Sequence, residues 1–457
     1  MRKLFACLLI NFLCTELSMA QVQDSINLRL IFSETLGNGK AYDNLRELTK
    51  NIGGRLSGSP EAAKAVEWTK RKMTEAGADT VFLQEVMVPH WVRGPKESAM
   101  IMEASGNKTP VPICALGNSI ATPQNGITAQ VIEVRDFEDL RNLGIENIKG
   151  KIVFYNYPFN EAYINTFEAY GDAVRFRWRG PSEASRYGAV ATICRSLTNA
   201  LDDFPHTGSM HYNDSFPPIP CCAISTNAAN LLSHILRANR NTQFYFKQQC
   251  QMLDSVLSYN VIGEIRGSEL PDEYIVVSGH LDAWDNGEGA HDDGAGIVQS
   301  IEMLRTIKAL NLKPRRTLRA VAYMNEENGL RGGKTYASVV KEKKVKHIAA
   351  IESDAGAFLP IGFGLNMPQE IKTKILKWAP LFLPYGIYKF SGEGDGADIS
   401  ALRDMDIALI GLEVNSQCYF DFHHAESDTF EKVNKRELHL GAAAMTSLAF
   451  LIAMHGL

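Results

Sequence analysis

The carboxyl-terminal half of the chain alternates short apolar runs with longer segments in which apolar residues recur every three or four positions. Short continuous apolar runs are typical of buried strands, and the longer period is typical of helices. Their alternation predicts an α/β fold with a mostly parallel or mixed sheet that is flanked by helices. The expected pairs of strand and helix are, in order, 273–280 with 295–310, 317–325 with 330–344, 347–353 with 369–379, and 407–414 with 434–454.

The amino-terminal half divides into two stretches of different pattern. Residues 21–90 have mainly helical periodicity, and Ser59 with Pro60 supplies the cap and the first-turn proline of one helix. Residues 91–250 carry short β-type runs, which predict a β-rich module. We therefore expect one α/β domain built from residues 21–90 and 251–457, with residues 91–250 inserted into it.

The amino terminus has the pattern of a secretion signal. Arg2 and Lys3 precede an apolar run at 4–13, and Ser18 and Ala20 are small residues that suit a signal peptidase. The apolar run is shorter than the roughly 20 residues that span a bilayer. A signal at residues 1–20, cleavage after it, and a secreted or periplasmic protein are expected. Such a location allows one or two disulfides, whose pairing stays open.

Composition narrows the partners that the protein can have. The 457 residues are 45% hydrophobic and 22% charged, which is ordinary for a globular protein. The net charge of -5 leaves no basic excess, which argues against nucleic acid or an anionic membrane surface as a partner. The apolar last helix contains Glu437 and His439, so we expect it to pack in the interior without stable membrane insertion. A short peptide or a small molecule fits better.

Histidines and carboxylates follow four of the predicted strands at the points where the strands end. In α/β sheets the carboxyl ends of the strands form the ligand-binding edge. A single acid there is more often a cap or a surface charge, whereas four such strand ends together indicate a metal site. The candidates, in chain order, are His280 and Asp292, then Glu326 and Glu327, then Asp354, and last His424.

The ligand types favour two zinc ions with Asp292 as the bridge. Each ion would keep one histidine and one further carboxylate, drawn from His280, His424, Glu327 and Asp354. Two divalent ions against three carboxylates leave one positive charge, which a bridging hydroxide would neutralise. Two metals roughly 3.5–4 Å apart can bind that hydroxide at neutral pH and polarise a substrate carbonyl.

Glu326 is the candidate general base. Adjacent side chains of an extended segment point in opposite directions, so Glu327 can bind metal while Glu326 faces the bridging water. This arrangement predicts hydrolysis of a peptide bond without a covalent enzyme intermediate.

These segments resemble the M28 metallopeptidases over essentially the whole mature chain. Within the family, the resemblance is to the plasma glutamate carboxypeptidase (carboxypeptidase Q) branch, in which a protease-associated domain is inserted into the catalytic domain. The matching segments are SGHLDAWDNGEGAHDDGAG, NEENGLRGG, ESDAG and YFDFHHAESDT, with KGKIVFYNYPF and HTGSMHY in the insert.

The resemblance implies roles for the matching residues, including Glu326 as the base and Asp292 as the bridge. Asp282 would orient His280, the usual task of an acid behind a metal-binding histidine. The resemblance also implies a strained peptide bond between Asp292 and Asp293, and a homodimer. The implied zinc ligands are His280, Asp292, Glu327, Asp354 and His424.

Three polar residues beside the candidates have less specific interpretations. We expect His291 and His423 in packing or loop roles, because two adjacent side chains cannot reach the same metal from an extended chain. Asp428 is equally compatible with a hydrogen bond to His424 and with a cap on the last turn.

Other segments have a structural interpretation and a functional alternative. Tyr419 is expected in the core, with stabilisation of an oxyanion as the alternative. The loop 391–398 lacks the Gly-Lys-Ser of a phosphate-binding loop, and the resemblance places it at the rim of the substrate cleft. His206 and His211 are expected to be structural, although their loop could reach the active site or a dimer partner.

The predicted function is a di-zinc exopeptidase that acts on dipeptides or short peptides with free ends. A broader aminopeptidase of the same family is the alternative, and a non-catalytic receptor-like protein is the alternative of another class. A folate- or acidic-peptide-type carboxypeptidase is less favoured because no arginine cluster lies near the ligand loops. A glutaminyl cyclase, with one zinc, is disfavoured by the complete set of five ligands.

Overall fold

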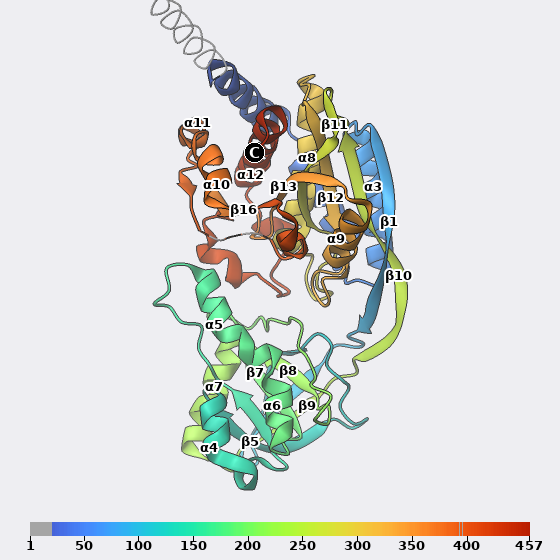
Figure 1. The fold of residues 1–457 in the computed structure, drawn as a ribbon. Helices are drawn as coiled ribbons and strands as arrows, with labels where there is room; N and C mark the ends of the chain where they lie inside the picture. The colour runs from blue at the N-terminus through green and yellow to red at the C-terminus, as the bar shows by residue number, and fades with distance from the viewer. Residues whose placement is uncertain (1–20, 393, 395) are drawn as a thin grey trace, which may run out of the picture.

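A computed structural model describes residues 21–392, 394 and 396–457. The expected secretion signal at residues 1–20 lies outside the described residues. The chain forms two eight-stranded sheets, which occupy the upper and lower parts of Figure 1. The long strands β1 (Thr80–Val92) and β10 (Gln251–Ile265) are antiparallel partners that run along one side between the two parts.

The first sheet has the strand order β1-β10-β12-β11-β13-β16-β14-β15. Its strands after β10 are β11 (Leu270–His280), β12 (Arg316–Tyr323), β13 (Lys346–Glu352), β14 (Pro360–Asn366), β15 (Lys389–Phe390) and β16 (Ala408–Val414). The central strands β12, β11, β13 and β16 are parallel, while β10 and β14 pair antiparallel with β12 and β16. The mixed α/β sheet expected from the sequence is therefore confirmed, although β14 was not expected.

Helices cover both faces of this sheet. Apart from a helix at residues 21–38, they are α2 (Ala41–Asn51), α3 (Pro60–Glu75), α8 (Ala295–Ala309), α9 (Arg331–Lys343), α10 (Gln369–Leu376), α11 (Ala379–Phe382) and α12 (Lys435–His455). Short turns of π or 3₁₀ helix occur at η1 (Ala290–Gly294), η2 (Leu383–Tyr385), η3 (Ile399–Met405), η4 (Ser416–Asp421) and η5 (Phe430–Lys432).

Strand β11 shows why the apolar runs are continuous. Ile275 and Val277 join a core that includes residues of α2, α3, α8 and α12. Val276, between them, joins a separate core with Tyr336 of α9 and Leu402 of η3. Because successive side chains of a strand point to opposite faces, a sheet that is covered on both faces requires apolar residues at every position.

Helix α12 is long and apolar enough to cross a membrane by composition, but 83% of its most apolar window is buried inside the protein. It packs against α8 and against strands of the first sheet. The expectation of an interior packing helix is therefore confirmed.

The second sheet lies in the stretch between β1 and β10 and has the order β3-β2-β9-β5-β6-β7-β8-β4. Its central strands β5 to β8 are parallel. The strands are β2 (Ser98–Met102), β3 (Lys108–Pro110), β4 (Ile113–Ala115), β5 (Ile127–Val134), β6 (Ile152–Tyr155), β7 (Ala191–Arg195), β8 (Cys221–Ile224) and β9 (Gln243–Lys247). We refer to residues 91–250 as the insert.

The insert also contains four helices, which the sequence pattern did not predict: α4 (Phe137–Ile148), α5 (Thr166–Trp178), α6 (Gly180–Arg186) and α7 (Thr226–Ala238). Helix α5 shows the reason. Phe176 packs in one apolar cluster of the insert, whereas Ala169 and Ala173 pack in another cluster with Tyr419. Its apolar residues therefore do not form the single stripe that identifies an amphipathic helix.

The cysteines of the described residues form no disulfide. Five of them are buried, and only Cys418 is exposed. Burial raises the pKa of the buried thiols, to about 12 for Cys194 and about 11 for Cys221. These side chains therefore serve as small apolar residues of the core.

Truncation of a core residue of α12 tests the importance of this helix. Leu448 is fully buried, so L448A is expected to reduce the free energy of unfolding by about 2–5 kcal/mol. The measurement is denaturant-induced unfolding followed by tryptophan fluorescence. The control L383A changes a leucine that is 57% exposed and should have little effect. Equal losses in the two variants would contradict the packing role of α12.

Candidate active site

The strand ends of the first sheet deliver the expected side chains to one place. His280 is the last residue of β11, and Asp354 lies two positions after β13. Glu326 and Glu327 follow β12, and His424 follows β16 and η4. The site therefore lies at the carboxyl edge of the parallel strands, where α/β sheets bind ligands.

Asp292 lies between two pairs of side chains. On one side, His280 Nε2 is 3.1 Å from Asp292 Oδ1 and 3.4 Å from Asp354 Oδ1. On the other side, His424 Nε2 is 3.2 Å from Asp292 Oδ2 and 3.1 Å from Glu327 Oε2. Each oxygen of one carboxylate thus meets a separate pair of one histidine and one further carboxylate.

The electrostatics of this cluster indicate an excess of negative charge. Burial and the neighbouring Asp292 raise the pKa of Glu327 to about 7, and burial raises the pKa of Asp354. Burial opposes protonation of His424, but the charges of Glu327 and Asp292 prevail and raise its pKa to about 9. Glu327 Oε1 is buried without a hydrogen-bond partner. Buried carboxylates of this kind fit bound cations.

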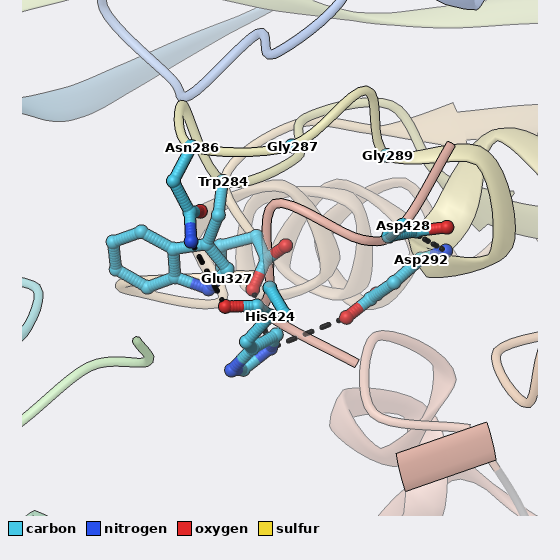
Figure 2. Close-up of a pocket in the computed structure, with 9 residues that line it drawn as sticks. Trp284, Asn286, Gly287, Gly289, Asp292, Glu327, His424 and Asp428 are labelled. Carbon is cyan, nitrogen blue, oxygen red and sulfur yellow. Dashed lines mark hydrogen bonds and ion pairs between the residues drawn. The ribbon is translucent and has the colours of Figure 1, made fainter. Parts of the chain in front are cut away.

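The main chain of Asp292 is held by Asp428. The Asp428 carboxylate accepts hydrogen bonds from His291 N at 2.8 Å and from Asp292 N at 3.1 Å. Figure 2 shows Asp428 beside Asp292, with Asp292 pointing to His424. Neither expected interpretation of Asp428, a bond to His424 or a cap on the last turn, describes this contact. The peptide bond between Asp292 and Asp293, where the resemblance implies strain, is cis.

Asp282 contacts His280 in a different way from the one expected. His280 Nδ1 lies 2.9 Å from the main-chain oxygen of Asp282. The Asp282 carboxylate instead accepts hydrogen bonds from Asn325 N at 2.7 Å and Glu326 N at 3.0 Å. Asp282 therefore orients His280 through its carbonyl group and the Glu326 segment through its carboxylate.

Arg55 holds the loop between β11 and η1 from behind, and the sequence analysis did not identify it. The side chain is fully buried. Its guanidinium donates to the carbonyl oxygens of Leu281 at 2.6 Å, Glu288 at 3.0 Å and Gly289 at 3.1 Å. The only sequence signal is an arginine in the glycine-rich segment GGRLSG, which does not reveal a partner more than 200 residues away.

The other acids of this loop have partners outside the cluster. Asp285 forms an ion pair with Arg93 at 2.6 Å, and Glu288 forms one with Lys50 at 2.6 Å. These two acids are thus engaged in ion pairs, and the assignment of His280 and Asp292 as the direct ligands from this loop stays a prediction.

The two neighbouring histidines differ in position. His291 stacks against Phe358 and Phe422 and accepts a hydrogen bond from Ala357 N, which fits its expected packing role. His423 stacks on His424, and its Nε2 is 3.7 Å from Asp292 Oδ2, so it is a third histidine within reach of the cluster. Glu327 Oε2 is 3.1 Å from His424 Nε2, which is shorter than the 3.7 Å between His423 Nε2 and Asp292 Oδ2. Glu327 is therefore a better candidate than His423 for the ligand beside His424 and Asp292.

The insert reaches the cluster through the loop that carries His206 and His211. Thr207 N donates to His424 O at 2.9 Å, and His424 Nδ1 lies 3.4 Å from Thr207 O. His206 is buried beside this contact, and His211 stacks on Trp178. The loop therefore reaches the active site, which was the alternative to a purely structural role.

A cavity of about 500 Å³ opens next to the cluster, between the first sheet and the insert. Glu326, half-buried, lines it together with Tyr419, Ala397 of the loop 391–398, and Arg177 of α5. The pocket whose lining residues are drawn in Figure 2, including Trp284, Asp292 and His424, has a volume of only about 10 Å³. The larger cavity is thus the one with room for a peptide. Tyr419 is also part of an aromatic core, so both of its expected interpretations remain compatible with its position.

Comparison with known proteins identifies the family of the chain. The family model described as peptidase family M28 matches residues 260–449. Carboxypeptidase Q of Xenopus laevis is 36% identical over 414 residues, which are 91% of this chain and 86% of that protein. The chain belongs to peptidase family M28.

Solved structures extend the likeness to the fold of the whole chain. A peptidase M28 precursor from Shewanella amazonensis SB2B is 31% identical, covers 95% of this chain and 97% of its own, and has a TM-score of 0.91. A zinc aminopeptidase from Bacillus subtilis shares the fold at 19% identity, covers 90% of this chain and 94% of its own, and has a TM-score of 0.63. The expected M28 membership is confirmed, and the protein is a metallopeptidase.

Substitution of Arg55 tests whether the ligand loop depends on it. R55M removes the donors that hold three loop carbonyls, so the affinity for a divalent metal is expected to fall by about 10- to 100-fold, as for other groups that orient metal ligands. Competition with a chromogenic chelator measures this affinity. R46M is the control, because the Arg46 side chain is 56% exposed. An unchanged metal affinity in R55M would contradict the role of Arg55 in holding this loop.

Proposed function

We propose that the protein is a two-zinc exopeptidase that hydrolyses dipeptides or short peptides with free ends. The observation that carries the proposal is the position of Asp292, whose two oxygens face two separate pairs of histidine and carboxylate. One pair would hold one zinc ion and the other pair the second. Two histidines and three carboxylates are the mixed nitrogen and oxygen ligands that zinc accepts.

Each residue of the cluster has a task in this proposal. Zinc bound here would polarise the scissile carbonyl and lower the pKa of a water molecule. Glu326 accepts the proton of the attacking water and passes it to the leaving amine. Asp282 holds the main chain of Glu326, and Asp428 holds that of Asp292. These hydrogen bonds fix the position of the proposed base, Glu326, relative to the proposed bridging ligand, Asp292.

The cavity supports a small substrate. Its volume of about 500 Å³ is within the range of small-molecule sites. Part of its wall comes from the insert, through Tyr170, Trp178 and Ser209. A peptide in the cavity would contact both parts of the protein, which gives the insert a part in substrate choice. We propose that this insert, at residues 91–250, is a protease-associated domain.

We also propose that the enzyme acts after export from the cytoplasm. The pattern of residues 1–20 supports this proposal, with a charged start, a short apolar run and small residues before the cleavage point. A homodimer remains a prediction that rests on the family resemblance.

Replacement of the proposed base tests the mechanism. E326Q keeps the size of the side chain but cannot accept the proton, so kcat for a dipeptide is expected to fall by about 10²- to 10⁴-fold. Bound zinc should stay at the wild-type level, measured by elemental analysis of the same samples. E370Q, on the surface helix α10, is the control and should keep full activity. Wild-type turnover in E326Q would contradict the assignment.

The number of zinc ions bound per chain tests the proposed bridging role of Asp292. Protein stripped with a chelator and titrated with zinc is expected to bind two equivalents per chain, and D292N should lose affinity for both, because Asp292 belongs to both groups. Calorimetry gives the stoichiometry. A single equivalent would contradict the two-zinc site. No binding under zinc-replete conditions would favour the non-catalytic alternative.

A further inference from the structure

Helix α5 of the insert presents a row of aromatic side chains to the active-site cavity. Phe167, Tyr170 and Trp178 belong to this helix and all line the cavity. With 3.6 residues per turn, the three positions lie within about 80° of one another around the helix axis. They therefore form one aromatic face of α5, and this face borders the same cavity as Glu326 and Asp354.

Trp178 is the most open side chain of this aromatic face. It is 43% exposed, whereas Tyr419 and Phe420, which belong to the same cavity wall, are each only 2% exposed. Phe167 is 37% exposed, but its ring stacks on Tyr419 at 5.3 Å and meets Phe420 at 5.0 Å between centroids. Single exposed apolar residues are ordinary, but apolar surface that is gathered in one cavity marks a ligand site.

The ring of Trp178 is supported by His211, which lies in the loop between β7 and β8. The two rings are stacked, with centroids 5.7 Å apart and planes 16° from parallel. His211 N donates to Trp178 O at 3.0 Å, and Ser182 Oγ donates to His211 O at 3.2 Å. A ligand that binds to this ring does not have to order it first, and a side chain that is already ordered lowers the entropic cost of binding.

The position of Trp178 in the chain brings it close to the cluster of candidate ligands. It follows Arg177, and a Cβ atom at Gly208 would collide both with the guanidinium of Arg177 and with Nδ1 of His424. Ser209, the next residue of that loop, lines the cavity as Trp178 does. Consecutive Cα atoms of a peptide are 3.8 Å apart, so a residue that adjoins the scissile bond stays beside this part of the wall.

We propose that Trp178 binds an aromatic side chain of the peptide substrate by stacking. The substrate class is then short peptides in which a residue next to the scissile bond is phenylalanine, tyrosine or tryptophan. Aromatic pairs attract each other beyond the effect of the buried area alone. Leu330, which is half-buried and follows the candidate base in the chain, adds apolar surface to the cavity from the other part of the protein. This assignment rests on the proposed function and names the side chain that the enzyme selects.

A purely structural role of Trp178 is the competing interpretation. Its stacking on His211 holds the loop that also carries Thr207, and Thr207 N donates to His424 O. If Trp178 only held this loop, its loss would reduce activity toward every peptide by the same factor and would alter zinc binding. If Trp178 contacts the substrate, its loss reduces activity chiefly toward peptides that have an aromatic side chain.

The test compares the dipeptides Ala-Phe and Phe-Ala with Ala-Ala, using the full-length zinc-loaded enzyme. The wild type is expected to prefer at least one aromatic dipeptide by about 10- to 100-fold in kcat/KM, the scale of burying a phenylalanine side chain. The preference should lie mainly in KM, because stacking binds the substrate and the transition state alike. W178A should lose most of it, and W178F should keep most of it. F204A, which removes a 41% exposed phenylalanine outside the cavity wall, should behave like the wild type.

Calorimetry with zinc-loaded E326Q gives the same comparison for binding alone, without turnover. A wild type with no aromatic preference, a preference that survives in W178A, or an equal loss toward all three dipeptides would exclude stacking on Trp178. Zinc content and the thermal transition of each variant identify misfolded protein. If W178A misfolds, W178L decides, because it keeps an apolar side chain without a ring and should prefer aromatic dipeptides less than W178F does. A zinc-loaded wild type that cleaves none of the dipeptides, while E326Q still binds the aromatic ones more tightly, would contradict the proposed function but not the aromatic site.

Discussion

Mutual repulsion among buried carboxylates is the constraint on which the rest of this structure depends. Asp292, Glu326, Glu327 and Asp354 meet at one edge of the sheet, and burial together with the neighbouring carboxylates raises the pKa values of Glu326, Glu327 and Asp354. A protein of ordinary stability cannot tolerate such a group without compensating charge and firm main-chain support. The histidines and the proposed zinc ions would supply compensating positive charge, and the buried Arg55 supports the main chain of the loop.

Hydrogen bonds to the main chain provide the second kind of support. Several acids around the cluster bind the backbone and are not among the proposed metal ligands. Asp282, Asp293 and Asp428 accept hydrogen bonds from backbone N–H groups of Glu326, His280 and Asp292. Arg55 does the converse and donates to backbone carbonyls of the same loop. The candidate functional side chains are thus held by residues that bind the main chain of their loops, which is how a site on loops keeps its geometry.

The sequence predicted those features that a local pattern encodes. Residues 275–277 of strand β11 are all apolar because both faces of the sheet are covered, and the end of the strand at His280 could be placed by inspection. The adjacency of Glu326 and Glu327 led to two different predicted roles for these residues, which stay predictions. The contacts that Arg55, Asp428 and Thr207 make could not be found in this way, because each joins residues more than 100 positions apart. Helix α5 was missed because its apolar residues face two clusters.

The contact between Thr207 and His424 has a consequence for how the active site is completed. His424 follows β16 and η4 near the end of the catalytic part of the chain, yet its main chain and its ring both contact a loop that is 217 residues earlier. The main-chain carbonyl at Thr207 is available only after the insert has folded and docked. The insert therefore cannot be exchanged for another domain of similar size without rebuilding this loop. The active site should then be complete only when the catalytic part and the insert have both folded and docked.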